Sequence, residues 1–87
     1  MAERIVSVTS PDGLHARPAA QFVKAAGEAG VMVTIGRPGS EQRADARSIL
    51  AVLALDVRQG DQVVLAADGD GADGALDRLA TLLEAHG

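Results

Sequence analysis

A proline at position 18 constrains this chain more than any other single residue, because it fixes where the first helix begins. Proline has a fixed φ and no amide hydrogen, so it fits the first turn of a helix and disrupts later turns. From Ala19 to Ala29, apolar residues recur at three- and four-residue spacing, which is the pattern of an amphipathic helix. The sequence therefore predicts a helix that begins near Ala16, with His15 at its N-cap boundary.

His15 is thus expected at a helix end that attracts anions. The first amide groups of a helix have no acceptor within the helix, and the helix dipole adds positive charge at the same place. Phosphate groups bind readily at such a terminus. The positive field also favours the uncharged imidazole, which is the nucleophilic form of histidine. This pattern suggests a histidine that carries a phosphoryl group, although the spacing alone leaves a capping or surface histidine open.

The order of apolar patterns along the chain predicts an α+β fold. Alternating or β-branched residues indicate strands at 5–9, 31–35, 41–44 and 62–67. Helical spacing indicates helices at 16–29, at 47–55 and between Asp70, a candidate N-cap, and His86. The order βαββαβα is typical of a two-layer open-faced sandwich, with three helices on one face of a four-stranded, mostly antiparallel sheet. Residues 1–87 are expected to form a single domain.

Composition and charge argue against several classes of function. The chain has 87 residues, a formal net charge of -4 and one aromatic residue, Phe22, so it lacks the positive charge and stacking surfaces that bind nucleic acid. It has no cysteine and only two histidines, so we expect no disulfide, no metal site and no cofactor. Because no targeting sequence or membrane-length apolar segment is present, we expect a cytoplasmic protein without membrane insertion.

Two motifs give the chain a resemblance to a known family. Gly13-Leu14-His15-Ala16-Arg17-Pro18-Ala19 and Arg47-Ser48-Ile49-Leu50 resemble the corresponding segments of HPr, the histidine-containing phosphocarrier of the bacterial phosphoenolpyruvate-dependent sugar phosphotransferase system. The similarity extends over essentially the whole chain. It implies that the protein accepts a phosphoryl group from enzyme I and passes it to sugar-specific IIA domains. Such a protein is a carrier and not an enzyme by itself.

The resemblance also implies a role for each residue around His15. His15 matches the phosphorylated histidine, which takes the group on Nδ1. The backbone amides of Ala16 and Arg17 would contact the phosphoryl oxygens, and the Arg17 guanidinium would add charged donors. Pro18 marks the start of the helix. Phosphoryl transfer depends mainly on positioning and charge stabilisation, which so small a domain can supply.

The second motif suggests regulation and docking. Ser48 matches the serine that many Gram-positive relatives present to a regulatory kinase, although a serine at a helix start is also an ordinary N-cap. The helix at 47–55 has more apolar residues than one buried face needs. The resemblance implies that some of them form an exposed patch beside the histidine, where enzyme I and IIA domains dock. This docking surface is assigned to Ile49, Leu50 and Leu53, with Gln21, Lys24, Arg47 and Arg17 around it.

Three features depart from the family pattern. Asp12 stands where relatives often have a small neutral residue. It could orient the neutral imidazole of His15 by accepting its N–H, but it would also repel an incoming phosphate. Asp56 replaces a common glycine, so it would have to adopt a left-handed backbone. The turn from Gly36 to Gln42 is about two residues longer than in several relatives, which a hairpin loop absorbs at little cost.

Other functions remain open on the sequence alone. A carrier in a regulatory or dihydroxyacetone-kinase phosphorelay would share the same motifs. A binding-only homologue that docks regulatory proteins is disfavoured because His15 is present. A small-molecule-binding domain is disfavoured because no glycine-rich ligand loop is evident. A monomer is expected, since a carrier must expose its site to successive partners.

Overall fold

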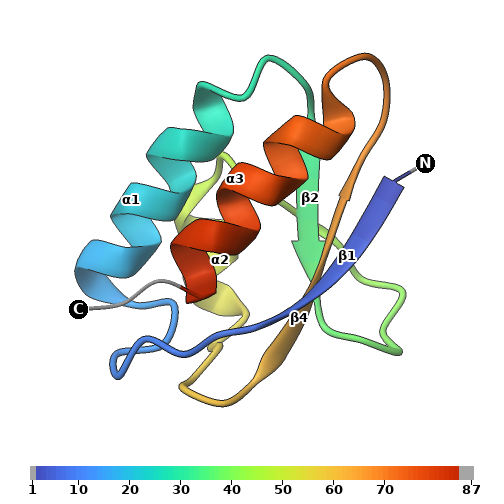
Figure 1. The fold of residues 1–87 in the computed structure, drawn as a ribbon. Coiled ribbons are helices and arrows are strands. Elements are labelled where there is room, and N and C mark those ends of the chain that lie inside the picture. Colours follow the sequence, from blue (N-terminus) through green and yellow to red (C-terminus); the bar gives the residue numbers. More distant parts are fainter. Residues whose placement is uncertain (1, 85–87) are drawn as a thin grey trace.

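A computed structural model describes residues 2–84 and confirms the predicted order of elements (Figure 1). The strands are β1 (Ala2–Ser7), β2 (Val33–Gly36), β3 (Ala44–Asp45) and β4 (Gln62–Ala67), and the helices are α1 (Ala16–Gly27), α2 (Ile49–Ala54) and α3 (Ala72–Glu84). The sheet order is β1-β4-β2-β3, and each pair of neighbours is antiparallel. Because the helices cover one face of this open sheet, the fold is the predicted open-faced α+β sandwich.

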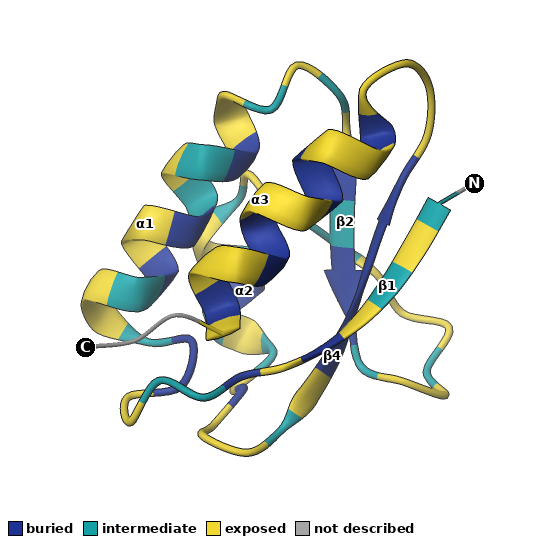
Figure 2. Ribbon diagram, viewed as in Figure 1, coloured by how far each residue is buried: buried dark blue, intermediate teal, exposed yellow. Residues whose placement is uncertain are grey.

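The hydrophobic core fills the space between the helices and the sheet. Each long helix turns its buried residues inward and its exposed residues outward, as Figure 2 shows. The largest fully buried side chains are Phe22, Leu14, Ile35, Leu65, Leu76 and Leu79. No polar or charged residue is buried in the described part of the chain. The polar groups that could perform chemistry therefore lie at the surface.

The strand boundaries differ from the sequence prediction. β1 ends at residue 7 instead of 9, and β2 begins at residue 33 instead of 31. β3 has two residues, Ala44 and Asp45, where a strand over 41–44 was predicted. The reason is that residues 37–42 form a turn, in which Ser40 N donates to Arg37 O and Ser40 Oγ accepts from Gln42 N.

The helix boundaries also differ in detail. α1 ends at residue 27 instead of 29, and α2 spans 49–54 instead of 47–55 because Ser48 caps it. α3 begins at Ala72, so Gly71 and not the predicted Asp70 precedes it directly. Within residues 2–84, no helix has the length and apolar character needed to cross a membrane.

The loop between β1 and α1 is held against the segment that follows α2. Gly13 has a φ of 62° and donates its amide hydrogen to Ser10 O, and the amide of the buried Leu14 donates to Val57 O at 2.9 Å. A Cβ atom at Gly13 would lie only 2.4 Å from Val57 O, so the close approach needs glycine. This docking brings residue 15 next to residue 56.

Candidate functional site

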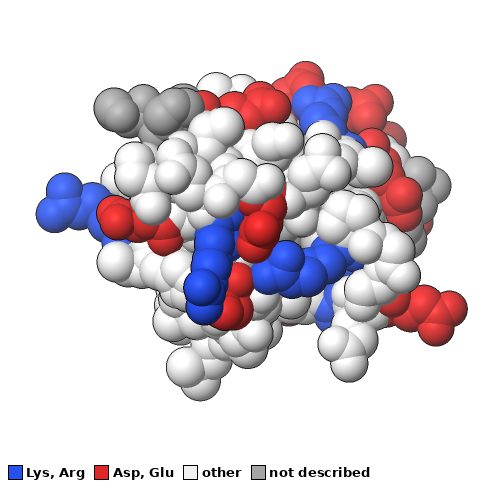
Figure 3. Space-filling view, turned by 90° about the horizontal axis from the view of Figure 1, so that it is seen from below, with Lys and Arg blue, Asp and Glu red and all other residues white. Residues whose placement is uncertain are grey.

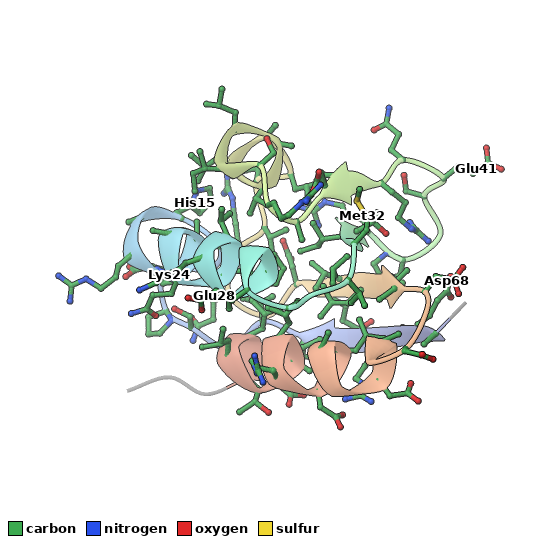
Figure 4. All side chains as sticks on the ribbon, turned by 90° about the horizontal axis from the view of Figure 1, so that it is seen from above. His15, Lys24, Glu28, Met32, Glu41 and Asp68 are labelled. Carbon is green, nitrogen blue, oxygen red and sulfur yellow. The ribbon has the colours of Figure 1, made fainter. Side chains whose placement is uncertain are left out.

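His15 is the N-cap residue of α1, which confirms the boundary predicted from Pro18. Its backbone is extended, with φ −129° and ψ 164°, and its side chain makes no capping hydrogen bond. The side chain is 38% exposed, and Figure 4 shows it at the beginning of α1, beside α2. The imidazole is therefore not used to cap the helix, and it is accessible to a ligand or another protein.

The first turn of α1 supplies hydrogen-bond donors next to this ring. The helical bonds begin with Ala19 N, which donates to His15 O at 3.5 Å, so the amides of Ala16 and Arg17 have no acceptor within the helix. Pro18 has no amide to satisfy. Arg17 is exposed, and the first turn has no acidic residue. The turn can therefore bind an anion through backbone amides and a guanidinium group.

Ala16 has a left-handed backbone, with a φ of 51°. For a residue with a Cβ atom this conformation costs about 1 kcal/mol or more. Strained residues of this kind cluster at functional sites, where the surrounding structure holds them in place. Ala16 is the first residue of α1, so this strained residue directly follows His15.

A carboxylate lies beside the imidazole, but it is not the predicted one. His15 Nε2 is 3.3 Å from Asp56 Oδ1. Of the described residues, it is Asp56 and not Asp12 that lies within ion-pair distance of the ring. Asp12 is exposed and instead lines a hollow between the β1–α1 loop and the end of α3. Asp12 therefore does not take the orienting position that the sequence left open, because the segment after α2 packs against the histidine loop.

Asp56 belongs to a network of alternating charges. Arg58 donates to Asp56 Oδ2 at 3.1 Å, and this bond is the main reason why the pKa of Asp56 lies below its ordinary value. Asp61 accepts from the amide of Arg58 at 3.0 Å and from Arg37 Nη1 at 3.3 Å, and its pKa is lowered, chiefly by the bond from the Arg58 amide. Figure 3, a view from below, shows acidic and basic side chains interleaved on this side of the molecule.

The α2 helix carries part of the predicted patch on its surface. Leu50 is 78% exposed and Ile49 is 39% exposed, whereas Val52 is fully buried. Leu53 is half-buried and packs against the core. Ser48 caps the helix, because its Oγ accepts from Ala51 N at 3.3 Å. The structure therefore exposes Ile49 and Leu50 on the surface of α2 and leaves Leu53 at the edge of the core.

The polar residues assigned to the same surface have different surroundings. Gln21 is exposed on α1 and borders the hollow that Asp12 also lines. Lys24 is exposed farther along α1 (Figure 4). Arg47 is exposed and forms an ion pair with Asp45, donating from Nε at 3.2 Å and from Nη2 at 3.1 Å. The side-chain bonds from Arg47 lower the pKa of Asp45, so much of the positive charge of Arg47 is offset locally.

Sequence reasoning missed the residues that surround the imidazole on its Nε2 side. It noted Asp56 only for its backbone, and the φ of 51° confirms the left-handed conformation expected there. It did not identify Arg58 or Arg37, which hold the side chain and the carbonyl group of Asp56. A sequence signal for this network was available, because one short loop alternates acidic and basic residues: Asp56, Arg58 and Asp61. Among residues 2–84, no group of three or more His, Cys, Asp or Glu side chains could hold a metal ion.

The sequence matches a known family over nearly its full length. The family model described as the PTS HPr component phosphorylation site matches residues 2–85. Phosphocarrier protein HPr from Streptomyces coelicolor is 51% identical over 83 residues, which cover 95% of this chain and 88% of that protein. Phosphocarrier protein HPr from Haloferax volcanii is 44% identical, over 93% of this chain and 91% of that protein.

Solved structures agree with the sequence matches. The crystal structure of HPr-C-His from Thermoanaerobacter tengcongensis superimposes with a TM-score of 0.88 at 34% identity, covering 97% of this chain and 92% of that one. HPr from Bacillus anthracis gives a TM-score of 0.87 at 30% identity, with coverages of 94% and 95%. With this fold, and with His15 at the start of α1, the chain belongs to the HPr family of phosphocarrier proteins of the phosphotransferase system.

Proposed function

We propose that this protein accepts a phosphoryl group from enzyme I on Nδ1 of His15 and passes it to sugar-specific IIA domains. The observation that carries this proposal is the half-exposed imidazole at the amide-rich start of α1. The protein would act as a carrier in the cytoplasm and not as an enzyme in its own right. A monomer fits this role, because two successive partners must reach the same ring.

The chemistry needs little from the protein beyond positioning. The lone pair on Nδ1 attacks phosphorus, the N–P bond forms, and the bond between phosphorus and the donor breaks with its electron pair returning to the donor. The amides of Ala16 and Arg17 and the Arg17 guanidinium would stabilise the negative charge on the phosphoryl oxygens. Transfer to the acceptor is the reverse displacement, so His15 is restored without a net change.

The exposed part of α2 would form the docking surface. Ile49 and Leu50 are exposed on α2 and would provide its apolar area, and Leu53, which packs against the core, would support them. Gln21, Lys24 and Arg47 are exposed and would form the polar rim of this surface. Apolar contacts with a polar rim are typical of protein interfaces. Ser48, at the edge of this surface, would be the target of a regulatory serine kinase.

The proposal is tested by incubating the protein with phosphoenolpyruvate and enzyme I and measuring its intact mass. We expect the mass of one phosphoryl group to be added, in a linkage that is lost in acid and stable in base, as expected for phosphohistidine. Adding a IIA domain should return the protein to its original mass. An unchanged mass with active enzyme I, or an acid-stable product, would contradict the carrier role.

Arg17→Ala is expected to slow phosphoryl transfer from enzyme I by about 10- to 100-fold, which is the effect of losing a hydrogen bond to a charged group. The fold should be unaffected, because Arg17 is exposed. The rate is measured by rapid quenching and phosphoprotein quantification. Arg78→Ala removes another exposed arginine, on α3, and is the matched control. Equal rates for the two variants would remove Arg17 from the site.

Leu50→Glu is expected to weaken binding to enzyme I by about tenfold or more, because it places a charge in the centre of the docking surface. Its effect on the free energy of unfolding should stay within about 0.5 kcal/mol, since the side chain is 78% exposed. Isothermal titration calorimetry gives the affinity. Ile5→Glu, at an exposed apolar residue of β1, is the control that should leave binding intact. The same loss in both variants would argue against a patch on α2.

A further inference from the structure

We propose that Asp56 is a positioning residue that sets the tautomer of His15. Its carboxylate lies beside Nε2 and favours the tautomer with the hydrogen on that nitrogen, so that the lone pair needed for phosphoryl transfer lies on Nδ1. The role of this tautomer in transfer rests on the proposed carrier function, whereas the contact between Asp56 and His15 does not depend on that function. The carrying observation is the 3.3 Å distance between His15 Nε2 and Asp56 Oδ1.

The backbone of Asp56 is held on both sides, which gives the carboxylate a defined place. Its amide donates to Leu53 O at 3.0 Å, and its carbonyl accepts from Arg37 Nη2 at 2.9 Å. The same Nη2 donates to Leu55 O at 2.8 Å, so one guanidinium group fixes the end of α2. On the other side, the bond from Leu14 N to Val57 O joins the histidine loop to this segment. The two segments are therefore tied together directly beside the contact.

The chemistry of the carboxylate decides which nitrogen carries the proton. Arg58 donates to Oδ2, and the pKa of Asp56 is lowered, so the group is ionised at neutral pH. An ionised carboxylate only accepts hydrogen bonds. It therefore pairs with Nε2 when that nitrogen bears hydrogen and repels its lone pair when it does not. A neutral imidazole has one N–H, so placing it on Nε2 leaves Nδ1 unprotonated.

The same contact continues through the transfer step. When Nδ1 forms its bond to phosphorus, Nε2 keeps its hydrogen and the ring becomes positively charged. Asp56 then faces a cation, which it stabilises, while Arg58 offsets the charge of the carboxylate before the phosphoryl group arrives. When the N–P bond breaks toward the acceptor, the electron pair returns to Nδ1. No proton has to move in either step.

Two substitutions distinguish the effect of the Asp56 carboxylate from the effect of its left-handed backbone. Asp56→Asn keeps the size of the side chain, and asparagine tolerates the φ of 51° found at this position. Its amide can donate as well as accept, so it no longer selects one tautomer. Asp56→Gly removes the side chain and relieves the left-handed strain. Asp12→Asn is the comparison at the other nearby carboxylate.

The tautomer is read directly from long-range proton–nitrogen correlation spectra of the imidazole, recorded at a pH where the ring is neutral. A His86→Asn variant identifies the signals of the other histidine. In the wild type we expect Nδ1 of His15 to be unprotonated and Nε2 to carry the hydrogen. Asp56→Asn and Asp56→Gly should both shift the spectrum toward a mixture of tautomers, with melting temperatures showing that the fold persists. Asp12→Asn should leave the wild-type pattern.

Transfer rates provide the second measurement. Both Asp56 variants should accept the phosphoryl group about two- to fivefold more slowly, the range that exposed ion pairs supply. An unchanged tautomer in both variants, or a shift caused by Asp12→Asn instead, would overturn the inference. The tautomer is measured without enzyme I, so it is separate from the carrier role. A wild-type protein with the expected tautomer that never accepts a phosphoryl group would contradict the proposed function alone.

Discussion

Gly13→Ala is expected to lower the free energy of unfolding by about 2 to 5 kcal/mol, the sum of a left-handed backbone penalty and a steric clash. The φ of Gly13 is 62°, and an added Cβ atom would lie 2.4 Å from Val57 O and 2.7 Å from the Cα atom of Arg58. Both are backbone atoms, so no side chain can rotate away. A domain of this size is stable by only about 5–15 kcal/mol, and the loss is therefore a large fraction of the total.

Urea unfolding followed by far-ultraviolet circular dichroism measures this loss, since the chain has no Trp or Tyr to report by fluorescence. Gly27→Ala is the matched control, because its added Cβ would meet nothing within 4 Å beyond its chain neighbours and its own helix backbone, and alanine is the better helix former at the end of α1. It should be as stable as the wild type or more so. Equal stability of the two variants would mean that the histidine loop does not pack closely against residues 57–58.

His15→Ala is expected to abolish acid-labile phosphorylation by enzyme I and phosphoenolpyruvate. The reason is that the proposed N–P bond needs the imidazole itself, which neither backbone amides nor a guanidinium group can replace. The fold should persist, because the His15 side chain makes no capping bond and is partly exposed. Intact-mass measurement before and after acid treatment quantifies the product.

The matched control for this loss is His86→Ala, at the only other histidine of the chain. It should be phosphorylated as completely as the wild type. Acid-labile label that persists in His15→Ala and disappears in His86→Ala would place the carrier function at the other end of the chain. Circular dichroism of both variants shows whether either loss reflects unfolding.

Local signals in the sequence predicted much of the fold and the centre of the site. Pro18 fixed the beginning of α1 and placed His15 at its N-cap, because the ring and the missing amide act on their own turn. Ser48 was expected at the start of a helix and caps α2 there. The excess of apolar residues in α2 predicted an exposed patch, and Leu50 is exposed while Val52 is buried.

The surroundings of His15 depended on contacts between distant segments, which local patterns do not contain. The sequence offered Asp12 as a possible partner of the imidazole, but Asp56 lies at the ring because the end of α2 packs beside the histidine loop. Arg37 reaches this end from the turn between β2 and β3. β3 was misplaced for a similar reason, since a two-residue edge strand has too little pattern to be located.

The central claim is that Nδ1 of His15 holds the phosphoryl group, and coupling between phosphorus and nitrogen tests it most directly. The nitrogen-15-labelled protein is phosphorylated with enzyme I, and its imidazole signals are correlated with phosphorus by magnetic resonance. We predict one phosphorus signal, coupled to Nδ1 of His15, while Nε2 keeps its hydrogen. Coupling to Nε2, or a phosphorus signal from any other residue, would contradict the claim.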